Sequence, residues 1–370
     1  RMNIVVLDAC RDNPFSDKSS GKGLAQLDAP PGTFLAYATA PGNVAEDGAG
    51  AANGLYTSFL LKELKKPQAR IEDVFKRTRF GVRQASNGRQ IPWESTSLED
   101  DFFFDPQTRK LDKPKLGSRE EDALFQIEKA AWDRIKDSGK AEDFFAFLQT
   151  FPSGFFSEQA TFKLNVRAKP TLAVAPTKDQ AAAGAVPVAA GNVERFRAGD
   201  RYTLVTKDGV SKAVTSRARF GVRAIQGDEL IAEEPDGAFL ADAMGGLIKD
   251  SSGTYDPPLA VLPAEFAIGK SWEGRTQWTN MYGLNTFSYR SRVTGREKIT
   301  IAAGTFDAWV IETRAINQRS NMPTGANTSV IRVWAVPHVG LPLRMLFQVR
   351  NTGGLQRSDV LELAQIHAPR

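Results

Sequence analysis

The sequence predicts three kinds of folded unit in series: part of an α/β domain whose mostly parallel sheet is flanked by helices, then a small helical unit, then an antiparallel β domain. The first unit is indicated by the continuous apolar run Ile4–Leu7, which is typical of a parallel strand covered by helices on both faces. Apolar residues recur at helical spacing over residues 118–166, and they alternate with polar residues after residue 193.

Shifts in composition suggest where these units begin and end. We expect the α/β unit at residues 1–106, the helical unit at 107–167 and the β domain at 193–370. Residues 168–192 are dominated by Ala, Pro, Val and Gly, which is the composition of an extended linker. A chain of 370 residues is long enough for two or three domains.

Composition also narrows the classes of function. An apolar share of 41% and a charged share of 25% are ordinary for a globular protein, so neither a disordered nor a fibrous chain is indicated. The formal charge of +5 comes without a Lys/Arg cluster interleaved with aromatic residues, so no nucleic-acid partner is predicted. The single cysteine excludes an intrachain disulfide, and no Cys/His spacing suggests a metal site, so we expect neither metal nor cofactor. No apolar run reaches about 18 residues, so no transmembrane segment is expected.

Two amphipathic helices are expected in the α/β unit, at residues 54–65 and about 71–86. The buried stripe of the second helix is predicted to consist of Ile71, Val74, Phe75 and Val82. Asp101–Phe104 is expected to form the last strand of the sheet, and Trp93 is expected to pack against that sheet rather than cap a cleft.

The helical unit has two candidate apolar faces. We expect the first to contain Leu124, Ile127, Ala131 and Ile135, and the second to contain Phe144, Phe147, Leu148 and Phe151. The unit is similar to a tetratricopeptide-type hairpin with Trp132 in its core. One such unit is more typical of a spacer or packing module than of a partner-binding groove.

The chemistry centres on Cys10, which lies just past the predicted first strand. Ligands and reactive groups of open α/β sheets collect at the carboxyl ends of strands, so a nucleophile is one interpretation of this cysteine. A small buried hydrophobe is the alternative. Asp8 and Arg11 flank Cys10, and because charged side chains are costly to bury, they favour a polar cleft.

The sequence resembles the caspase-like cysteine peptidases, which include the metacaspases, in three blocks: Asp8-Ala9-Cys10-Arg11, Thr33–Gly42 and Asn53–Leu64. The resemblance covers about residues 2–106. It implies a bacterial thiol protease, a hydrolase in which Cys10 is the nucleophile of a Cys-His dyad and its backbone N–H is an oxyanion donor. The family carries its histidine on the strand before the cysteine strand, whereas the histidines here are His338 and His367. We therefore expect an N-terminal portion of the domain to precede this sequence, and the fragment alone to be inactive.

The resemblance also implies the specificity. Metacaspases carry an aspartate at the position of Asp8, and a carboxylate there favours cleavage after Arg or Lys. The alternative is that Asp8 only orients a loop or pairs with Arg11. The block around Ala36, Ala38, Thr39 and Ala40 is expected to bind an extended protein or peptide substrate by β-augmentation.

The β domain shows no catalytic constellation. Its blocks at 268–272, 293–297 and 303–308 resemble a curved-sheet domain of unknown function from bacterial envelope proteins. This resemblance favours the periplasm or cell envelope over the cytoplasm. It also leaves an alternative function, in which the caspase-like unit is an inactive scaffold and the β domain binds a peptide or lipid of the envelope.

Overall fold

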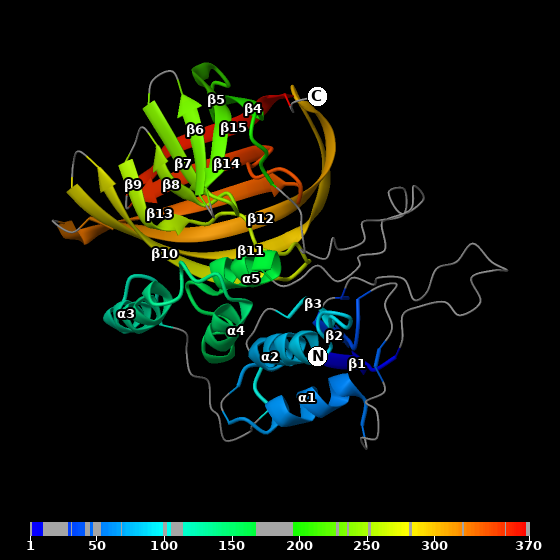
Figure 1. The fold of residues 1–370 in the computed structure, drawn as a ribbon. Helices are drawn as coiled ribbons and strands as arrows, with labels where there is room; N and C mark the ends of the chain where they lie inside the picture. Colours follow the sequence, from blue (N-terminus) through cyan, green and yellow to red (C-terminus); the bar gives the residue numbers. More distant parts are fainter. Residues whose placement is uncertain are drawn as a thin grey trace.

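The computed structural model describes residues 2–9, 29–30, 32–40, 45–46, 53–67, 69–98, 102–104, 114–167, 195–226, 229–234, 237–250, 253–280, 283–319, 322–351 and 353–367. A small sheet with two helices lies at one end of the molecule and a large β sheet at the other, with three helices between them (Figure 1). The linker expected at 168–192 lies outside the described residues.

The small sheet has the strand order β1-β2-β3. Strands β1 (Asn3–Leu7) and β2 (Thr33–Tyr37) are parallel, whereas β3 (Trp93–Thr96) runs antiparallel to β2. The described sheet is therefore mixed, and the expected parallel sheet is confirmed only for β1 and β2. The strand expected at Asp101–Phe104 is wrong: Phe103 makes one isolated bridge with Arg70. Phe102 and Phe104 pack against the apolar core instead, with their rings edge to face.

Helices α1 (Leu55–Leu64) and α2 (Ile71–Ala85) cover one face of this sheet. The stripe predicted for α2 is confirmed, because Ile71, Val74, Phe75 and Val82 are all buried. Strand β1 is not covered on both faces as expected. It lies at the edge of the described sheet, where Val5, Val6 and Leu7 remain about 40% exposed.

Helices α3 (Arg119–Asp133), α4 (Ala141–Thr150) and α5 (Ser157–Arg167) form the helical unit. Its aromatic core contains Trp132, as predicted, with Phe144, Phe147 and Phe156 stacked or tilted around it. Phe80 of α2 belongs to the same cluster, so the helical unit packs directly on the α/β unit. On the second predicted face, Phe144, Phe147 and Leu148 are buried and Phe151 packs against them.

The first predicted face, around α3, is only partly confirmed, because Ala131 and Ile135 pack against the aromatic core but the other two residues do not. Leu124 and Ile127 are 50% and 62% exposed, whereas Glu121 and Glu128 lie on the buried face. Both carboxylates have partners: Glu128 accepts hydrogen bonds from the backbone of Phe155 and Phe156 at 2.8 Å, just before α5, and Glu121 forms an ion pair with Arg275 at 3.2 Å. These partners offset part of the cost of desolvation, although for Glu128 burial still outweighs the two hydrogen bonds and raises the pKa to about 7.

The predicted antiparallel β domain is confirmed. Strands β4 to β15 each pair with antiparallel neighbours, and the pairs β9–β10 and β15–β4 close the sheet on itself. Their bounds are β4 (Arg201–Asp208), β5 (Val214–Gln226), β6 (Glu229–Glu234), β7 (Gly237–Asp242), β8 (Leu247–Asp250), β9 (Gly253–Leu259), β10 (Ser271–Asn280), β11 (Gly283–Ile301), β12 (Gly304–Arg319), β13 (Met322–Ala335), β14 (Arg344–Asn351) and β15 (Gly354–His367).

Candidate active site at the carboxyl end of the small sheet

The parallel strands β1 and β2 end side by side, and this edge carries the residues singled out from the sequence. Leu7 is in register with Tyr37, and the N–H of Ala38 donates to the carbonyl of Leu7 at 2.9 Å. Asp8 therefore follows β1 directly beside the segment that follows β2. Cys10 and Arg11 lie outside the described residues.

Asp8 is held at the amino end of α1. The hydroxyl of Thr57, in the first turn of the helix, donates a hydrogen bond to Asp8 Oδ2. Gly54 is the N-cap, and a Cβ atom at that position would lie 3.6 Å from the same oxygen. The positive end of the helix dipole favours a carboxylate here. Asp8 is exposed and, in the described part of the chain, no basic side chain pairs with it; Arg11, the alternative partner, lies outside that part.

Gln90, which the sequence did not single out, links the parts of this edge. Its side chain is fully buried, its Nε2 donates to the carbonyl of Ala38 at 2.9 Å, and its Oε1 accepts from the N–H of Glu46 at 2.9 Å. The carbonyl of Glu46 in turn accepts from the N–H of Leu55 at the start of α1. One amide therefore joins the end of β2 to the helix that holds Asp8.

The predicted peptide-binding residues are mostly enclosed. Ala36 lies in the central strand, in register with Val6 on one side and Glu94 on the other. The N–H and carbonyl of Ala38 are bonded to Leu7 and Gln90. An added strand therefore finds no free edge at either alanine, because β1 and β3 already occupy both sides of β2.

Two buried hydroxyls near this edge lack hydrogen-bond partners among the described residues. They are Thr39 Oγ1, just after Ala38, and Tyr56 Oη on α1. Burial raises the pKa of Tyr56 well above its usual range, and the charges of Glu94 and Asp8 add to the effect. An unpaired buried hydroxyl costs about 1–3 kcal/mol. Ala40 is half-buried, and residues 41–44 after it lie outside the described part.

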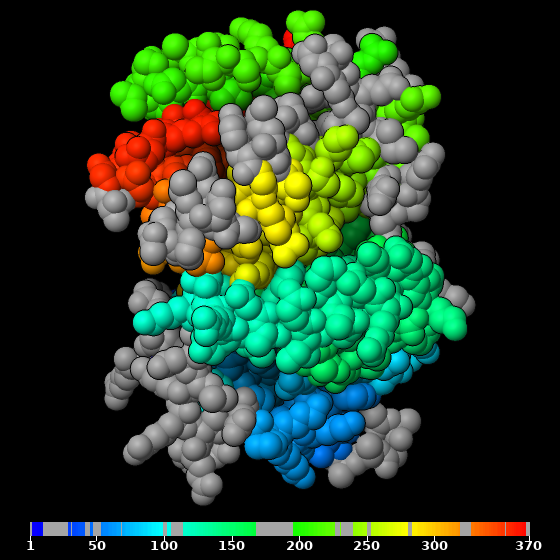
Figure 2. Space-filling model, turned by 90° about the vertical axis from the view of Figure 1, so that its left-hand side faces the viewer, coloured from blue at the N-terminus to red at the C-terminus, as the bar shows by residue number. Residues whose placement is uncertain are grey.

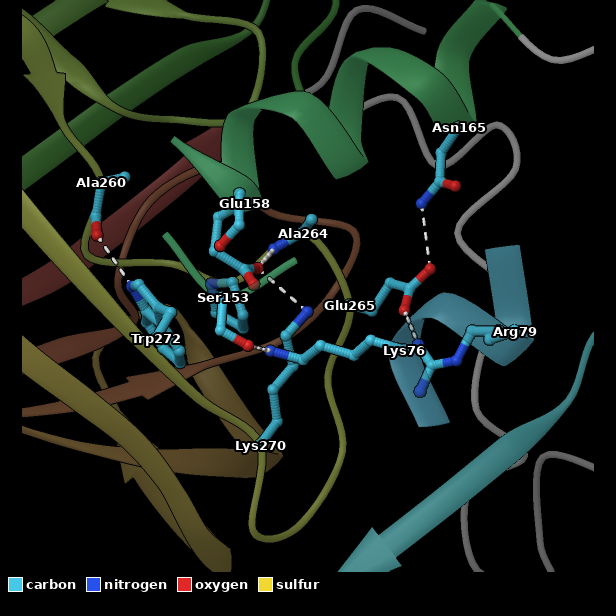
Figure 3. Close-up of polar contacts among 12 residues, drawn as sticks. Lys76, Arg79, Ser153, Glu158, Asn165, Ala260, Ala264, Glu265, Lys270 and Trp272 are labelled. Atoms are coloured by element: carbon cyan, nitrogen blue, oxygen red, sulfur yellow. Dashed lines mark hydrogen bonds and ion pairs between the residues drawn. The ribbon is translucent and has the colours of Figure 1, made fainter. Parts of the chain in front are cut away.

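A second polar cluster lies where the three units meet, around a cavity of about 60 Å³ (Figure 3). Arg79 of α2 pairs with Glu94 of β3 and, at 2.7 Å, with Glu265 from the loop before β10. Asn165 of α5 donates to Glu265 at 3.1 Å. Neither Asp8 nor residues 38–40 line this cavity.

The remaining charges of the junction are also paired. Glu158 of α5 accepts from the N–H of Ala264 at 2.7 Å and forms an ion pair with Lys270 at 2.9 Å, while Lys76 donates to Ser153 at 2.9 Å (Figure 3). Burial alone would raise the pKa of Glu265, but the charges of Arg79 and Lys270 outweigh it and lower the value to about 2. The contacts of Glu158 join the helical unit to the β domain, the contact of Lys76 joins the α/β unit to the helical unit, and the Arg79–Glu265 pair joins the α/β unit directly to the β domain.

The histidines lie in the β domain, His338 in the turn between β13 and β14 and His367 at the end of β15. Burial lowers the pKa of His338. Neither makes a side-chain contact with the small sheet in the part of the chain that is described. Among those same residues, no three His, Cys, Asp or Glu side chains gather as a metal site.

The geometry thus defines an α/β scaffold with an acidic group at the carboxyl end of its first strand. Residues 1–103 match the model of the caspase domain, so this part of the chain is similar to a cysteine-peptidase scaffold. The match covers less than half of the chain. No curated protein matches the chain at a significant level.

Solved structures resemble the chain in its C-terminal part. A putative exported protein with a YmcC-like fold from Bacteroides fragilis is 11% identical, covers 46% of this chain and 97% of its own, and has a TM-score of 0.32. A putative lipoprotein from Parabacteroides distasonis is 11% identical, with 47% and 98% coverage and a TM-score of 0.31. The hypothetical lipoprotein YmcC from Escherichia coli is 14% identical, with 50% and 91% coverage and a TM-score of 0.31. No helix in the described residues has the length and apolarity needed to cross a membrane.

Proposed function

We propose that the α/β unit is part of a caspase-like cysteine endopeptidase that cleaves peptide bonds after Arg or Lys. The observation that carries the proposal is the placement of Asp8: an exposed carboxylate, held by Thr57 at the amino end of α1, two residues before the only cysteine. The caspase-domain match over residues 1–103 supports the same assignment. A guanidinium or ammonium group of the substrate would pair with Asp8, whereas an aspartate would be repelled.

In the proposed reaction, a histidine takes the proton of the Cys10 thiol, and the thiolate attacks the carbonyl carbon of the substrate. The C–N bond then breaks, the leaving amine receives the proton from the histidine, and water hydrolyses the thioester. We assign the base to the His-Gly pair that the family carries before its cysteine strand, because among the described residues neither His338 nor His367 contacts the small sheet. An unassisted thiol with a pKa near 8.5 is only a few per cent thiolate at neutral pH, so the base is essential.

Thr39 and Gln90 have supporting roles in this proposal. Thr39 Oγ1 is a buried acceptor without a partner among the described residues, close in sequence to the end of β2. A guanidinium has five donors in a fixed fork, so it can use an acceptor besides Asp8. Gln90 keeps the two sides of the edge together through Ala38 and Glu46.

The test uses the natural protein isolated from its host. An irreversible arginine-directed cysteine probe should modify Cys10, and fluorogenic peptides with Arg or Lys before the scissile bond should be cleaved while Asp peptides are not. Cys10→Ala should abolish both results. Asp8→Asn should lower kcat/KM for Arg peptides by roughly 10- to 100-fold, the loss expected for one hydrogen bond to a charged group. Thr57→Ser, which keeps the hydroxyl, is the matched control.

An inactive scaffold whose β domain binds a peptide or lipid is the rival function. In that case the probe leaves Cys10 unmodified while the protein is folded by circular dichroism. If Asp8→Asn leaves cleavage after Arg unchanged, the peptidase assignment stands but the pocket assignment is wrong. We also infer a location in the periplasm or cell envelope from the blocks of the β domain, which subcellular fractionation would test.

A further inference from the structure

Two hairpin tips of the closed sheet lie next to each other. Strands β4 and β15 are antiparallel, with Asp208 opposite Asp359, and beyond this pair the N–H of Gly209 donates to the carbonyl of Ser358 at 2.7 Å. The turn between β4 and β5 therefore runs alongside the first residues of β15. The β14–β15 tip, around Gly354, lies farther along at the same end of the sheet.

These neighbouring tips expose apolar side chains to solvent. Val210 is 77% exposed, Val214 is 48% exposed and Leu355 is 44% exposed. The β4–β5 turn is fixed in shape, because Asp208 Oδ1 accepts hydrogen bonds from the N–H groups of Val210, at 3.1 Å, and Ser211, at 2.7 Å. The valines are consequently presented outward by a structured turn.

Basic side chains accompany them. Arg350 is directly opposite Leu355 in the β14–β15 pair, Lys212 is in the β4–β5 turn, and Arg217 is three residues after Val214, roughly 10 Å along the strand. All three are exposed, and within the described residues no carboxylate pairs with Arg217 or Arg350.

The carboxylates nearest to these tips already have partners. Asp208 accepts from the amides of its own turn, Asp359 is paired with Arg357, and Glu362 is paired with Lys207 at 2.5 Å. The tips therefore combine exposed apolar groups with the positive charges of Arg217 and Arg350, whereas the charge of Lys212 acts on the neighbouring carboxylate of Asp208 and lowers its pKa. Figure 2 shows this end of the sheet, with β4 and β5 in green above β15 in red.

We propose that this hairpin patch, defined as Val210, Lys212, Val214, Arg217, Arg350 and Leu355, docks on an anionic phospholipid membrane surface. Lipid headgroups supply the negative charge that the basic residues attract, and the hydrocarbon boundary beneath them accepts valine and leucine side chains. A dissolved polyanion would use only the basic residues and would leave the apolar ones in water. The combination of the two kinds of side chain is what selects a membrane.

The experiment is a sedimentation assay of the full chain with vesicles of phosphatidylcholine alone or with 30% phosphatidylglycerol. We expect binding to the anionic vesicles only, and its loss in about 0.5 M salt, where the Debye length is only a few ångströms. Arg217→Gln combined with Arg350→Gln should lower the partition coefficient by about 30-fold, because each basic residue near an anionic surface contributes about one factor of five. Val210→Gln combined with Leu355→Gln should lower it by roughly tenfold.

The control variants carry the same changes elsewhere. Arg134→Gln with Lys140→Gln removes two exposed charges from the helical unit, and Leu61→Gln removes an exposed apolar group from α1; both should bind like the unchanged protein. Equal binding of patch and control variants would overturn the proposal. Binding to soluble heparin that Val210→Gln leaves unchanged would also overturn it, because that result would indicate a polyanion as the partner. Self-association in sedimentation velocity that Val210→Gln abolishes would overturn it too, because that result would indicate a second copy of the chain.

Discussion

Replacing Glu265 by Gln tests whether buried charge holds the β domain to the α/β unit. Glu265 is paired with Arg79 at 2.7 Å, and both side chains are about 15% exposed. Its pKa is lowered from 4.5 to about 2, which corresponds to roughly 3 kcal/mol of stabilisation of the ionised form. Because the folded-state pKa is depressed, this stabilisation is present above pH 4.5 and is lost as the pH falls toward 2. Glu265→Gln should therefore reduce the free energy of unfolding by about 2–3 kcal/mol at pH 7.

The assay is urea unfolding of the full chain, followed by tryptophan fluorescence at several values between pH 7 and pH 2.5. The difference between the unchanged protein and Glu265→Gln should be largest at pH 7 and should shrink steadily below pH 4.5. Glu312→Gln is the control, because Glu312 is 54% exposed and its ion pair with Arg332 is long, at 4.0 Å, so the pair should contribute little. A difference that is absent at pH 7, or that does not change with pH, would refute the electrostatic explanation of the junction.

Three further predictions concern single buried contacts. Gly269→Ala should destabilise the chain by about 3 kcal/mol or more in thermal unfolding, because φ is +83° at this residue and a Cβ would lie 1.7 Å from the carbonyl oxygen of Thr96. Gly295→Ala should have little effect, because a Cβ at that position would meet no atom within 4 Å. Gln90→Ala should cost about 2–4 kcal/mol in urea unfolding because it leaves the buried carbonyl of Ala38 and the half-buried N–H of Glu46 without their partner, and exposed Gln84→Ala should not. Burial raises the pKa of Glu128 to about 7 against the hydrogen bonds from Phe156 and Phe155, so this carboxyl should stabilise the fold progressively as the pH falls from 7 to 4.5. The slope should become shallower in Glu128→Gln but should not disappear, because burial also raises the pKa of Asp242, to about 6; an unchanged slope would assign it to other groups.

The elements that the sequence predicted correctly are those whose signal is local. The stripe of α2 and the antiparallel alternation of the β domain follow from periods of 3.6 and 2, which depend only on neighbouring residues. The prediction for α3 failed at Leu124 and Ile127, which are exposed, and held at Ala131 and Ile135, which pack against the core. Glu121 and Glu128 face inward only because Arg275 and the amides before α5 are there to meet them.

The candidate site likewise has features that could be predicted from neighbouring residues and features that depend on distant ones. That Asp8 follows a strand could be expected from the apolar run before it, and the position of that strand beside β2 places Asp8 at the carboxyl edge. The part played by Gln90 could not be expected, since its partners Ala38 and Glu46 are 52 and 44 residues away. The predicted strand at Asp101–Phe104 failed for a related reason: a short run of aromatic residues does not tell side chains that fill a core from a strand that pairs in a sheet.

The sequence by itself therefore determined the order of the units, the type of most elements and the acidic motif before Cys10, because these features depend on neighbouring residues. Only the tertiary structure decided which charges are paired and which are free. Arg79 meets Glu265 across 186 residues, while Arg217 and Arg350 project from neighbouring hairpins without a described partner. The physical reason is that burying a charge is favourable only when a partner lies within a few ångströms, and chain topology alone brings distant partners that close.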